Sequence, residues 1–241
     1  MTRNERPFCS LPPATYTQRK HQKNLRIRVT GNGITVSGPA RCTHKEMRDF
    51  YWKKADWIKK AWQNQQEKEK KRRLLIEKNR GTLLIRGIRK RIIEQVQTDG
   101  KKSLIDELDE YVVLYHNPKE KEGKEAAVNT FYLKAALKEL PVHLARNSKL
   151  LSVSPGKLSI RNQKTRWGSC SRKGNISLNW RLIKCPVWIV NYIIIHELVH
   201  LRHFNHSRAF WQEVTQCFPE TDKARKWIRQ HEAEVFTEDG L

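Results

Sequence analysis

The sequence predicts a mixed α+β fold, because strand patterns and helix patterns alternate irregularly along its 241 residues. Apolar and polar residues alternate at Leu25–Val29 and at Ile34–Ser37, and the glycine-rich turn between them is typical of a β-hairpin. Thr43 and Glu46 have the spacing of a helix capping box, which predicts a helix directly after the hairpin. Residues 187–201 are apolar almost all round, which indicates a buried helix.

The N-terminal part is expected to hold this hairpin and one long basic helix. Asn32-Gly33 suits the tight turn of the hairpin. The helix that the capping box opens is expected to continue to Asn79, and Gly81 fits its end. A stripe of large side chains along this helix is expected to pack in a core rather than to stack on bases: Trp52, Trp57, Ile58 and Trp62.

Two or three strands are expected next, around Thr82–Val96 and Tyr111–Tyr115. Residues 118–124 form a charged stretch that contains proline and glycine, which indicates a loop and a domain boundary. We therefore expect an N-terminal domain over residues 1–120, with the hairpin, the basic helix and these strands. The domain over residues 121–241 contains the apolar helix.

In the C-terminal part, a helix is expected over Glu125–Leu140, stopped or kinked by Pro141. Lys157–Asn162 and Asn175–Asn179 have strand patterns and flank a turn-like segment. Pro186 suits the first turn of the apolar helix. Two further helices are expected, separated by Pro219: Arg208–Phe218 and Asp222–Phe236.

The apolar helix carries His196, Glu197 and His200 in the pattern His-Glu-x-x-His. Side chains four residues apart share one helix face, about 6 Å apart along the axis, so two imidazoles can bind one zinc ion. Glu197 can then reach a water that the metal activates. Burying these groups costs free energy unless something satisfies them. A pair of hydrogen-bonded core histidines is the alternative, but it leaves Glu197 and the downstream histidines unexplained.

A catalytic zinc needs a third protein ligand and one open position, and His203 and His206 are the nearest candidates. His203 falls on the same helix face, yet three ligands along one straight helix span about 10 Å and cannot converge. His206 requires the helix to end first, and residues 204–207 resemble such a break, where Asn205 or Ser207 can cap a new helix. His206 is therefore the predicted third ligand, and His203 a lower-ranked ligand or a polar group beside the site.

The spacing of these three histidines is that of metzincins. However, His203 stands where metzincins carry a turn glycine, and the only methionines are Met1 and Met47, so the downstream Met-turn is missing. A carboxylate third ligand, Glu213 or Glu220, is less favoured than a surface charge at those positions.

The residues predict hydrolysis in which Glu197 takes a proton from water and delivers it to the leaving group. The oxyanion that forms needs a donor besides the metal, and Tyr192, Arg166 and His203 are the candidates. The strand at Ile176–Asn179 is in the right place in the sequence to be an edge strand that holds an extended peptide.

Charge and cysteine content suggest the partners and the compartment. The net charge is +23 and the isoelectric point about 10.1, which favours an anionic partner such as nucleic acid. The charge is concentrated over residues 64–80, and residues 161–167 mix basic side chains with a tryptophan. Residues 1–7 lack the apolar stretch of a signal peptide, and no apolar run is long enough to span a membrane. The scattered, odd-numbered cysteines favour a reducing cytoplasm: Cys9, Cys42, Cys170, Cys185 and Cys217.

Three functions stay open on these residues. The first is a cytoplasmic zinc metallopeptidase, acting on proteins near nucleic acid. The second is a basic nucleic-acid-binding protein with a structural zinc. The third is a metal-dependent hydrolase of a non-peptide bond.

Several segments, dense from about residue 125 to 230, resemble the YgjP-like family of metal-dependent hydrolases, which is similar to the SprT-like zinc metallopeptidases: Arg166–Cys170, Asn175–Leu182, Tyr192–Leu201, Asn205–Ser207 and Phe210-Trp211. The resemblance implies a zincin-like catalytic domain, in which the His-Glu-x-x-His helix packs against a small antiparallel sheet. It also implies zinc ligands at His196, His200 and His206, with Glu197 as the catalytic acid and base. SprT-like proteins act on DNA-bound proteins, and the positive charge of this chain agrees with a substrate of that kind.

Overall fold

The computed structural model describes residues 11–98, 100–237, 239 and 241, and it confirms a mixed α+β chain. Residues 1–7 and Cys9, which entered the predictions on targeting and redox state, lie outside the described residues. The chain divides into two compact units, Met1–Leu74 and Leu75–Leu241. This division differs from the boundary expected near residue 120, because the strands before that point pack with the helix after it.

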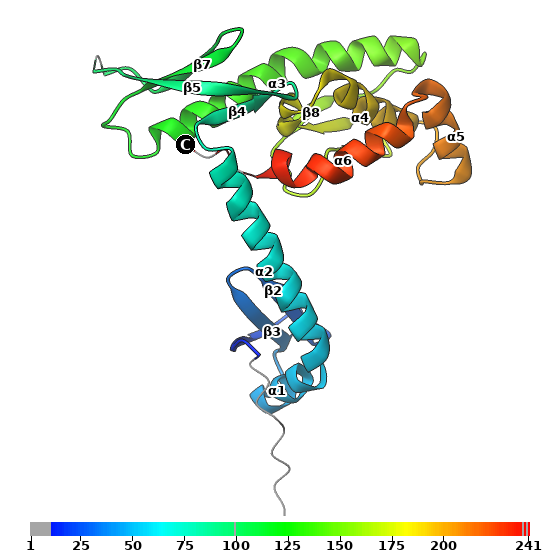
Figure 1. The fold of residues 1–241 in the computed structure, drawn as a ribbon. Helices are drawn as coiled ribbons and strands as arrows, with labels where there is room; N and C mark the ends of the chain where they lie inside the picture. The colour runs from blue at the N-terminus through cyan, green and yellow to red at the C-terminus, as the bar shows by residue number, and fades with distance from the viewer. Residues whose placement is uncertain (1–10, 99, 238, 240) are drawn as a thin grey trace, which may run out of the picture. The chain divides into compact units, whose positions relative to one another are not determined.

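The N-terminal unit is built on a small sheet in the order β1-β3-β2 (Figure 1). The predicted hairpin is confirmed: β2 (Arg26–Thr30) pairs antiparallel with β3 (Gly33–Pro39), and Gly33 takes a φ of 139° at the turn. A strand that the sequence did not predict, β1 (Ala14–Arg19), pairs parallel with β3. A compact core lies between this sheet and the following helices: Ile34, Val36, Cys42, Met47, Tyr51 and Ile58.

The predicted capping box is present, with Thr43 Oγ1 accepting from the Glu46 amide at 3.2 Å and Glu46 accepting from the Thr43 amide at 2.7 Å. The helix it opens is interrupted at Lys54, which separates α1 (His44–Lys53) from α2 (Ala55–Lys78). The expectation that Trp52 and Trp57 pack in the core was wrong, because their exposed fractions are 48% and 53%. The three-stranded sheet buries only one narrow face of α1 and α2, and Trp52 and Trp57 lie outside that face.

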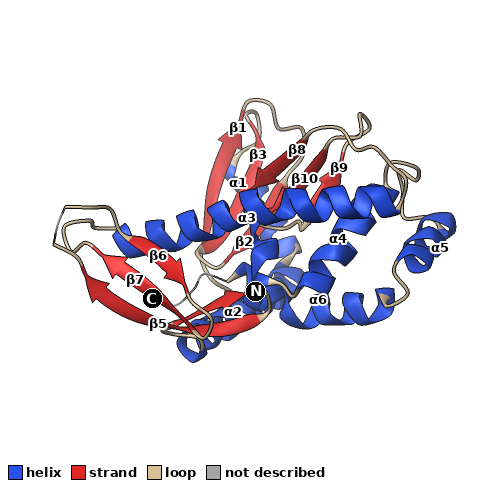
Figure 2. Ribbon diagram, turned by 90° about the horizontal axis from the view of Figure 1, so that it is seen from above, coloured by secondary structure: helices blue, strands red, loops and turns tan. Residues whose placement is uncertain are grey.

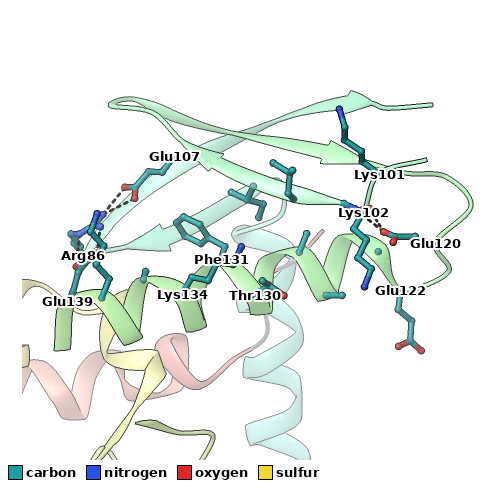
Figure 3. Close-up of a pocket in the computed structure, with 18 residues that line it drawn as sticks. Arg86, Lys101, Lys102, Glu107, Glu120, Glu122, Thr130, Phe131, Lys134 and Glu139 are labelled. Atoms are coloured by element: carbon teal, nitrogen blue, oxygen red, sulfur yellow. Dashed lines mark hydrogen bonds and ion pairs between the residues drawn. The ribbon is translucent and has the colours of Figure 1, made fainter. Parts of the chain in front are cut away.

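The second unit begins with a sheet in the order β4-β5-β7-β6: β4 (Thr82–Ile85), β5 (Ile88–Val96), β6 (Leu104–Glu107) and β7 (Tyr111–His116). In this sheet β5 and β7 pair in parallel, and the other two neighbouring pairs are antiparallel. The long helix α3 (Gly123–Leu150) packs beside β6, and a groove of about 880 Å³ lies between them (Figure 3). Arg86 closes one end of this groove through Glu107, at 2.8 Å, and Glu139.

Pro141 lies inside α3 and does not stop it, contrary to the predicted end at Leu140. The helix continues for more than two turns because that part is also anchored in the core. Leu144, Asn147 and Ser148 are buried there, and the Asn147 side chain donates to Asn191 at 3.0 Å.

The third sheet has the order β8-β10-β9, with β8 (Leu158–Arg161), β9 (Gly168–Cys170) and β10 (Ile176–Asn179) (Figure 2). The prediction that Ile176–Asn179 is an edge strand was wrong, because β10 pairs with β8 on one side and β9 on the other. The segment expected to be only a turn contains one of the two edge strands, β9. It pairs antiparallel with β10 and packs against the apolar helix. Because β10 pairs parallel with β8, the sheet is mixed, whereas the resemblance had implied an antiparallel sheet.

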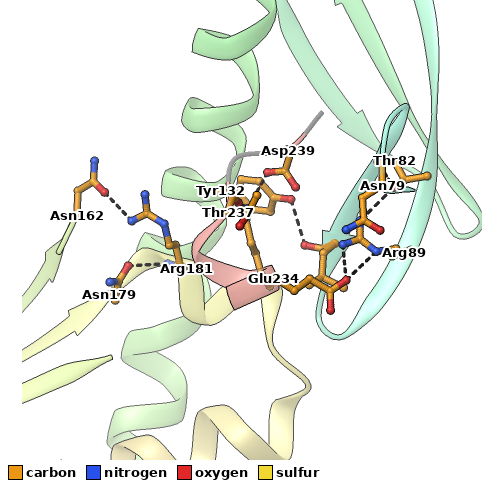
Figure 4. A network of polar contacts seen from close by, with 12 residues as sticks. Asn79, Thr82, Arg89, Tyr132, Asn162, Asn179, Arg181, Glu234, Thr237 and Asp239 are labelled. Carbon is orange, nitrogen blue, oxygen red and sulfur yellow. Dashed lines mark hydrogen bonds and ion pairs between the residues drawn. The ribbon is translucent and has the colours of Figure 1, made fainter. Parts of the chain in front are cut away.

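After η1 (Trp180–Lys184), the remaining helices are α4 (Val187–Val199), α5 (Arg208–Cys217) and α6 (Thr221–Phe236). Apolar side chains of α3, α4 and the two sheets pack together in one core in the second unit. Where α6 ends, Arg89 donates to Glu234 and Thr82, each at 3.0 Å (Figure 4). The fully buried ammonium of Lys184 pairs with Asp239 at 2.7 Å. Within the described residues, no helix combines the length and apolar character that crossing a membrane requires.

Candidate metal centre

The helix α4 ends before His206, as a third histidine ligand from the following segment requires. Its apolar side chains are buried on nearly all sides, as the sequence predicted, and regular helix stops at Val199 with His200 as the C-cap. Residues 201–206 contain no helix or strand, so the chain can reverse before α5. Ser207, one of the two predicted caps, accepts from the Phe210 amide at 3.4 Å. This break returns His206 to the face of α4 that carries His196 and His200.

One ring nitrogen from each of His196, His200 and His206 lies within 4.8 Å of the other two. The Nε2 atoms of His196 and His206 are 3.1 Å apart. Two ligands at zinc–nitrogen distances of 2.0–2.1 Å and a tetrahedral angle would be about 3.3 Å apart. The three-nitrogen donor set and its spacing therefore fit a zinc ion.

The rings are fixed by their surroundings. His200 Nδ1 lies 2.8 Å from the carbonyl oxygen of His203, so the Nδ1–H donates there and Nε2 is left to bind a metal. Phe210 stacks on His200 with ring centroids 4.5 Å apart, and Trp211 stacks on His206 at 5.6 Å. The imidazoles are thus oriented before any ion enters.

His203 contributes its carbonyl to this arrangement and not its ring. The ring Nε2 lies 2.8 Å from Glu213, which also binds Arg202. Glu220, the other carboxylate considered from the sequence, pairs with Lys223 at 2.9 Å. The structure therefore brings neither His203 nor these carboxylates into the three-nitrogen cluster.

Glu197 is buried, with 6% of its surface exposed, and its carboxylate lies against β9. A Cβ atom on Gly168 would come within 2.8 Å of Glu197 Cγ and 2.9 Å of Oε1, so only glycine leaves room for this side chain. Burial raises the pKa of Glu197 from 4.5 to about 7, while the Arg166 charge and a backbone hydrogen bond from Cys170 oppose the rise. A carboxyl group with this pKa can both accept and return a proton near neutrality.

Two of the three imidazoles, His196 and His206, are held neutral. Burial lowers the pKa of His196 to about 3, with further lowering from His200, His206 and Arg225. Burial and His200 also lower the pKa of His206. Since only a neutral imidazole binds a metal, this environment favours the ligand form.

Beside Glu197 lies a pocket of about 430 Å³ that contains Arg166 and Tyr192, two of the predicted substrate contacts. Tyr192 is buried, and its ring centroid lies 6.2 Å from that of His196. The sequence interpretation missed Gly168, Arg225 and Arg229, which also line the pocket. The four-residue spacing of the two arginines on a predicted helix was the only signal available for them.

A buried helix that supplies two of three converging imidazoles and a carboxylate is the arrangement of a metal-dependent hydrolase. A family model described as the YgjP-like metallopeptidase domain matches residues 23–231. The chain therefore belongs to the YgjP-like metallopeptidase family, which confirms the resemblance noted in the sequence.

Two solved structures are similar to part of the chain. The metallopeptidase zymogen abylysin of Pyrococcus abyssi is 28% identical with a TM-score of 0.35, over 39% of this chain and 95% of that one. The metallopeptidase zymogen jannalysin of Methanocaldococcus jannaschii is 24% identical with a TM-score of 0.36, over 39% of this chain and 98% of that one. Comparison with curated proteins gives no match.

Proposed function

We propose that this protein hydrolyses peptide bonds with one zinc ion held by His196, His200 and His206. The observation that supports the proposal is the convergence of the three ring nitrogens beside the buried carboxylate of Glu197. Three imidazoles and an open position are the ligand set of catalytic zinc sites. The helix α4, packed against β9, would be the core of a zincin-like domain.

In the proposed mechanism a zinc ion held by the three histidines would supply Lewis acidity for the hydrolysis. The Glu197 carboxylate accepts a proton from the attacking water and returns it to the leaving nitrogen. Arg166 and Tyr192 lie in the adjacent pocket and are the side chains available to stabilise the oxyanion. His203 instead orients His200 through its carbonyl.

The edge strand β9 is the proposed platform for the substrate backbone. It is unpaired on the side away from β10 within the described sheet, and it lies directly against Glu197. An extended peptide that pairs with β9 would bring its own backbone close to the metal ligands. This replaces the platform expected at Ile176–Asn179.

The test is metal analysis combined with a peptidase assay on the wild type and Glu197→Gln. We expect one zinc per chain in both proteins, turnover in the wild type that chelation abolishes, and no turnover in Glu197→Gln. Full activity in Glu197→Gln would refute the role of this carboxylate. Zinc binding without cleavage of any peptide would favour a structural zinc, and chelator-sensitive cleavage of another bond type would favour a non-peptide hydrolase.

A second candidate function, contact with nucleic acid, is favoured by the N-terminal unit. Trp52 and Trp57 are exposed there, and Lys53, Lys54 and Lys60 are exposed beside them. Exposed aromatic rings among cations can stack on unpaired bases. Salt-sensitive binding of a single-stranded oligonucleotide that weakens in Trp52→Ala/Trp57→Ala and persists in Glu197→Gln would support this contact. Equal binding by the tryptophan variant would refute it.

The proposed location is the cytoplasm. Cys42, Cys170, Cys185 and Cys217 are free thiols, as expected of a protein in a reducing compartment.

A further inference from the structure

The pocket beside Glu197 carries an excess of positive charge. Arg225 and Arg229 lie one turn apart on α6, and Arg166 comes from the segment directly before β9. The rest of the lining includes apolar and aromatic side chains: Trp167, Tyr192, Ile193 and Ile228. Like charges four residues apart on a helix repel each other, so this arrangement costs stability as long as no anion is present.

The described residues place few acidic side chains at this cluster, and the charge of Arg166 acts on one of them, Glu197. Among the described residues that line the pocket, Glu197 is the only carboxylate. Arg225 lies 4.0 Å from Asp222, whose side chain is 99% exposed, where an ion pair contributes little. In the described part of the chain, Arg166 and Arg229 form no ion pair.

The Arg225 side chain and the backbone of Arg166 each have a contact near the candidate centre. The guanidinium of Arg225 lies 4.5 Å from the centroid of the Trp211 ring, and its charge acts on the pKa of both His196 and Tyr192. The backbone carbonyl of Arg166 accepts from the buried Asn179 side chain at 2.8 Å, which fixes the segment that carries it. Planar guanidinium groups suit a carboxylate, which they can bind with paired hydrogen bonds.

We propose that Arg225 and Arg229 form a subsite that binds a carboxylate of the substrate next to the scissile bond, with the charge of Arg166 adding to the positive potential of the pocket. This inference rests on the peptidase function proposed above. The carboxylate can come from an aspartate or glutamate side chain, or from the C-terminus of the substrate. The apolar walls accommodate the methylene groups that carry it.

The experiment compares matched peptides. One set carries Glu or Gln at each of three positions on either side of the cleaved bond, and a second set ends in a free carboxylate or an amide. The enzymes are the wild type, Arg225→Gln/Arg229→Gln, and Lys226→Gln as a control that removes one charge from an exposed position of the same helix outside the pocket. Zinc content is measured for each protein.

For the wild type we expect kcat/KM to favour the carboxylate peptide by about tenfold to hundredfold at one position, as for a hydrogen bond to a charged group. The double variant should reduce this ratio to near one, whereas Lys226→Gln should keep it. Arg225→Glu/Arg229→Glu should shift the preference to a Lys-containing peptide. Preference within the first set identifies a side chain, and preference within the second identifies a C-terminus.

Binding is measured separately, by fluorescence anisotropy of the same peptides on zinc-loaded Glu197→Gln. Equal dissociation constants for Glu and Gln peptides, together with equal kcat/KM in the wild type, would overturn the subsite and leave the peptidase function intact. Preferential binding of the carboxylate peptides without any cleavage by the wild type would overturn the peptidase function and keep the anion-binding pocket.

Discussion

Gly168 lies so close to the Glu197 side chain that no Cβ atom fits between them. Gly168→Ala should therefore impair hydrolysis without unfolding the protein. A Cβ atom there would lie 2.8 Å from Cγ, 2.9 Å from Oε1 and 3.0 Å from Cδ of Glu197. Carbon atoms in favourable contact are about 3.5–4.0 Å apart, so the carboxylate or the strand must move by roughly 0.7 Å or more.

The size of the effect follows from that displacement. A misplacement of about 1 Å in a catalytic group costs about a hundredfold in rate, so we expect kcat/KM to fall about tenfold to hundredfold. Gly168 is not among the glycines with positive φ, so alanine can take its backbone conformation. The melting temperature and the zinc content should therefore change little.

The assay is peptide hydrolysis at saturating zinc, with metal content and thermal unfolding measured on the same samples. Gly31→Ala is the matched control, because a Cβ there meets only Gln65 Nε2, at an ordinary 3.7 Å. Wild-type kcat/KM in Gly168→Ala would refute the reasoning.

Three further changes test the rest of the site and its support. His206→Ala should lose tightly bound zinc, while His203→Ala should keep it because His203 acts through its backbone carbonyl. Metal analysis after dialysis measures the zinc content of both variants, and equal loss of zinc would contradict the prediction. In chelated protein, the free energy of unfolding of the wild type should fall by about 3 kcal/mol relative to Glu197→Gln as the pH rises from 4.5 to 8. The pKa of Glu197 is about 7 in the folded protein and 4.5 in the unfolded chain, so the unfolded chain loses its proton first and rising pH favours unfolding. Denaturant unfolding at both pH values measures it, and an unchanged difference would contradict it. Asp239→Ala should cost about 3–5 kcal/mol because it leaves Lys184 buried and unpaired, and Lys184→Met should restore most of that loss in thermal unfolding.

The local parts of the fold and site were predictable because their causes lie within a few residues. The capping box, the hairpin turn and the apolar helix each depend on a short pattern. The preference for His206 over His203 also followed from helix geometry, and the structure brings His206 to the other two imidazoles.

The parts that were missed depend on contacts between distant segments. The strand β9 is only three residues long, and its pairing with β10 sets which strand is the edge. Arg225 and Arg229 reach the site from α6, which no local pattern connects to α4. Pro141 is tolerated because tertiary packing outweighs the lost backbone hydrogen bond.

The core around α4 has a consequence for how the protein acquires its metal. The helix is fixed by apolar contacts on nearly all sides, and the His200 tautomer is set by a carbonyl. Small zinc modules whose fold depends on the ion unfold when it is removed, whereas here the chain's own packing builds the centre. Folding thus precedes loading, and chelation followed by zinc addition should switch the activity off and on while the circular dichroism spectrum stays constant.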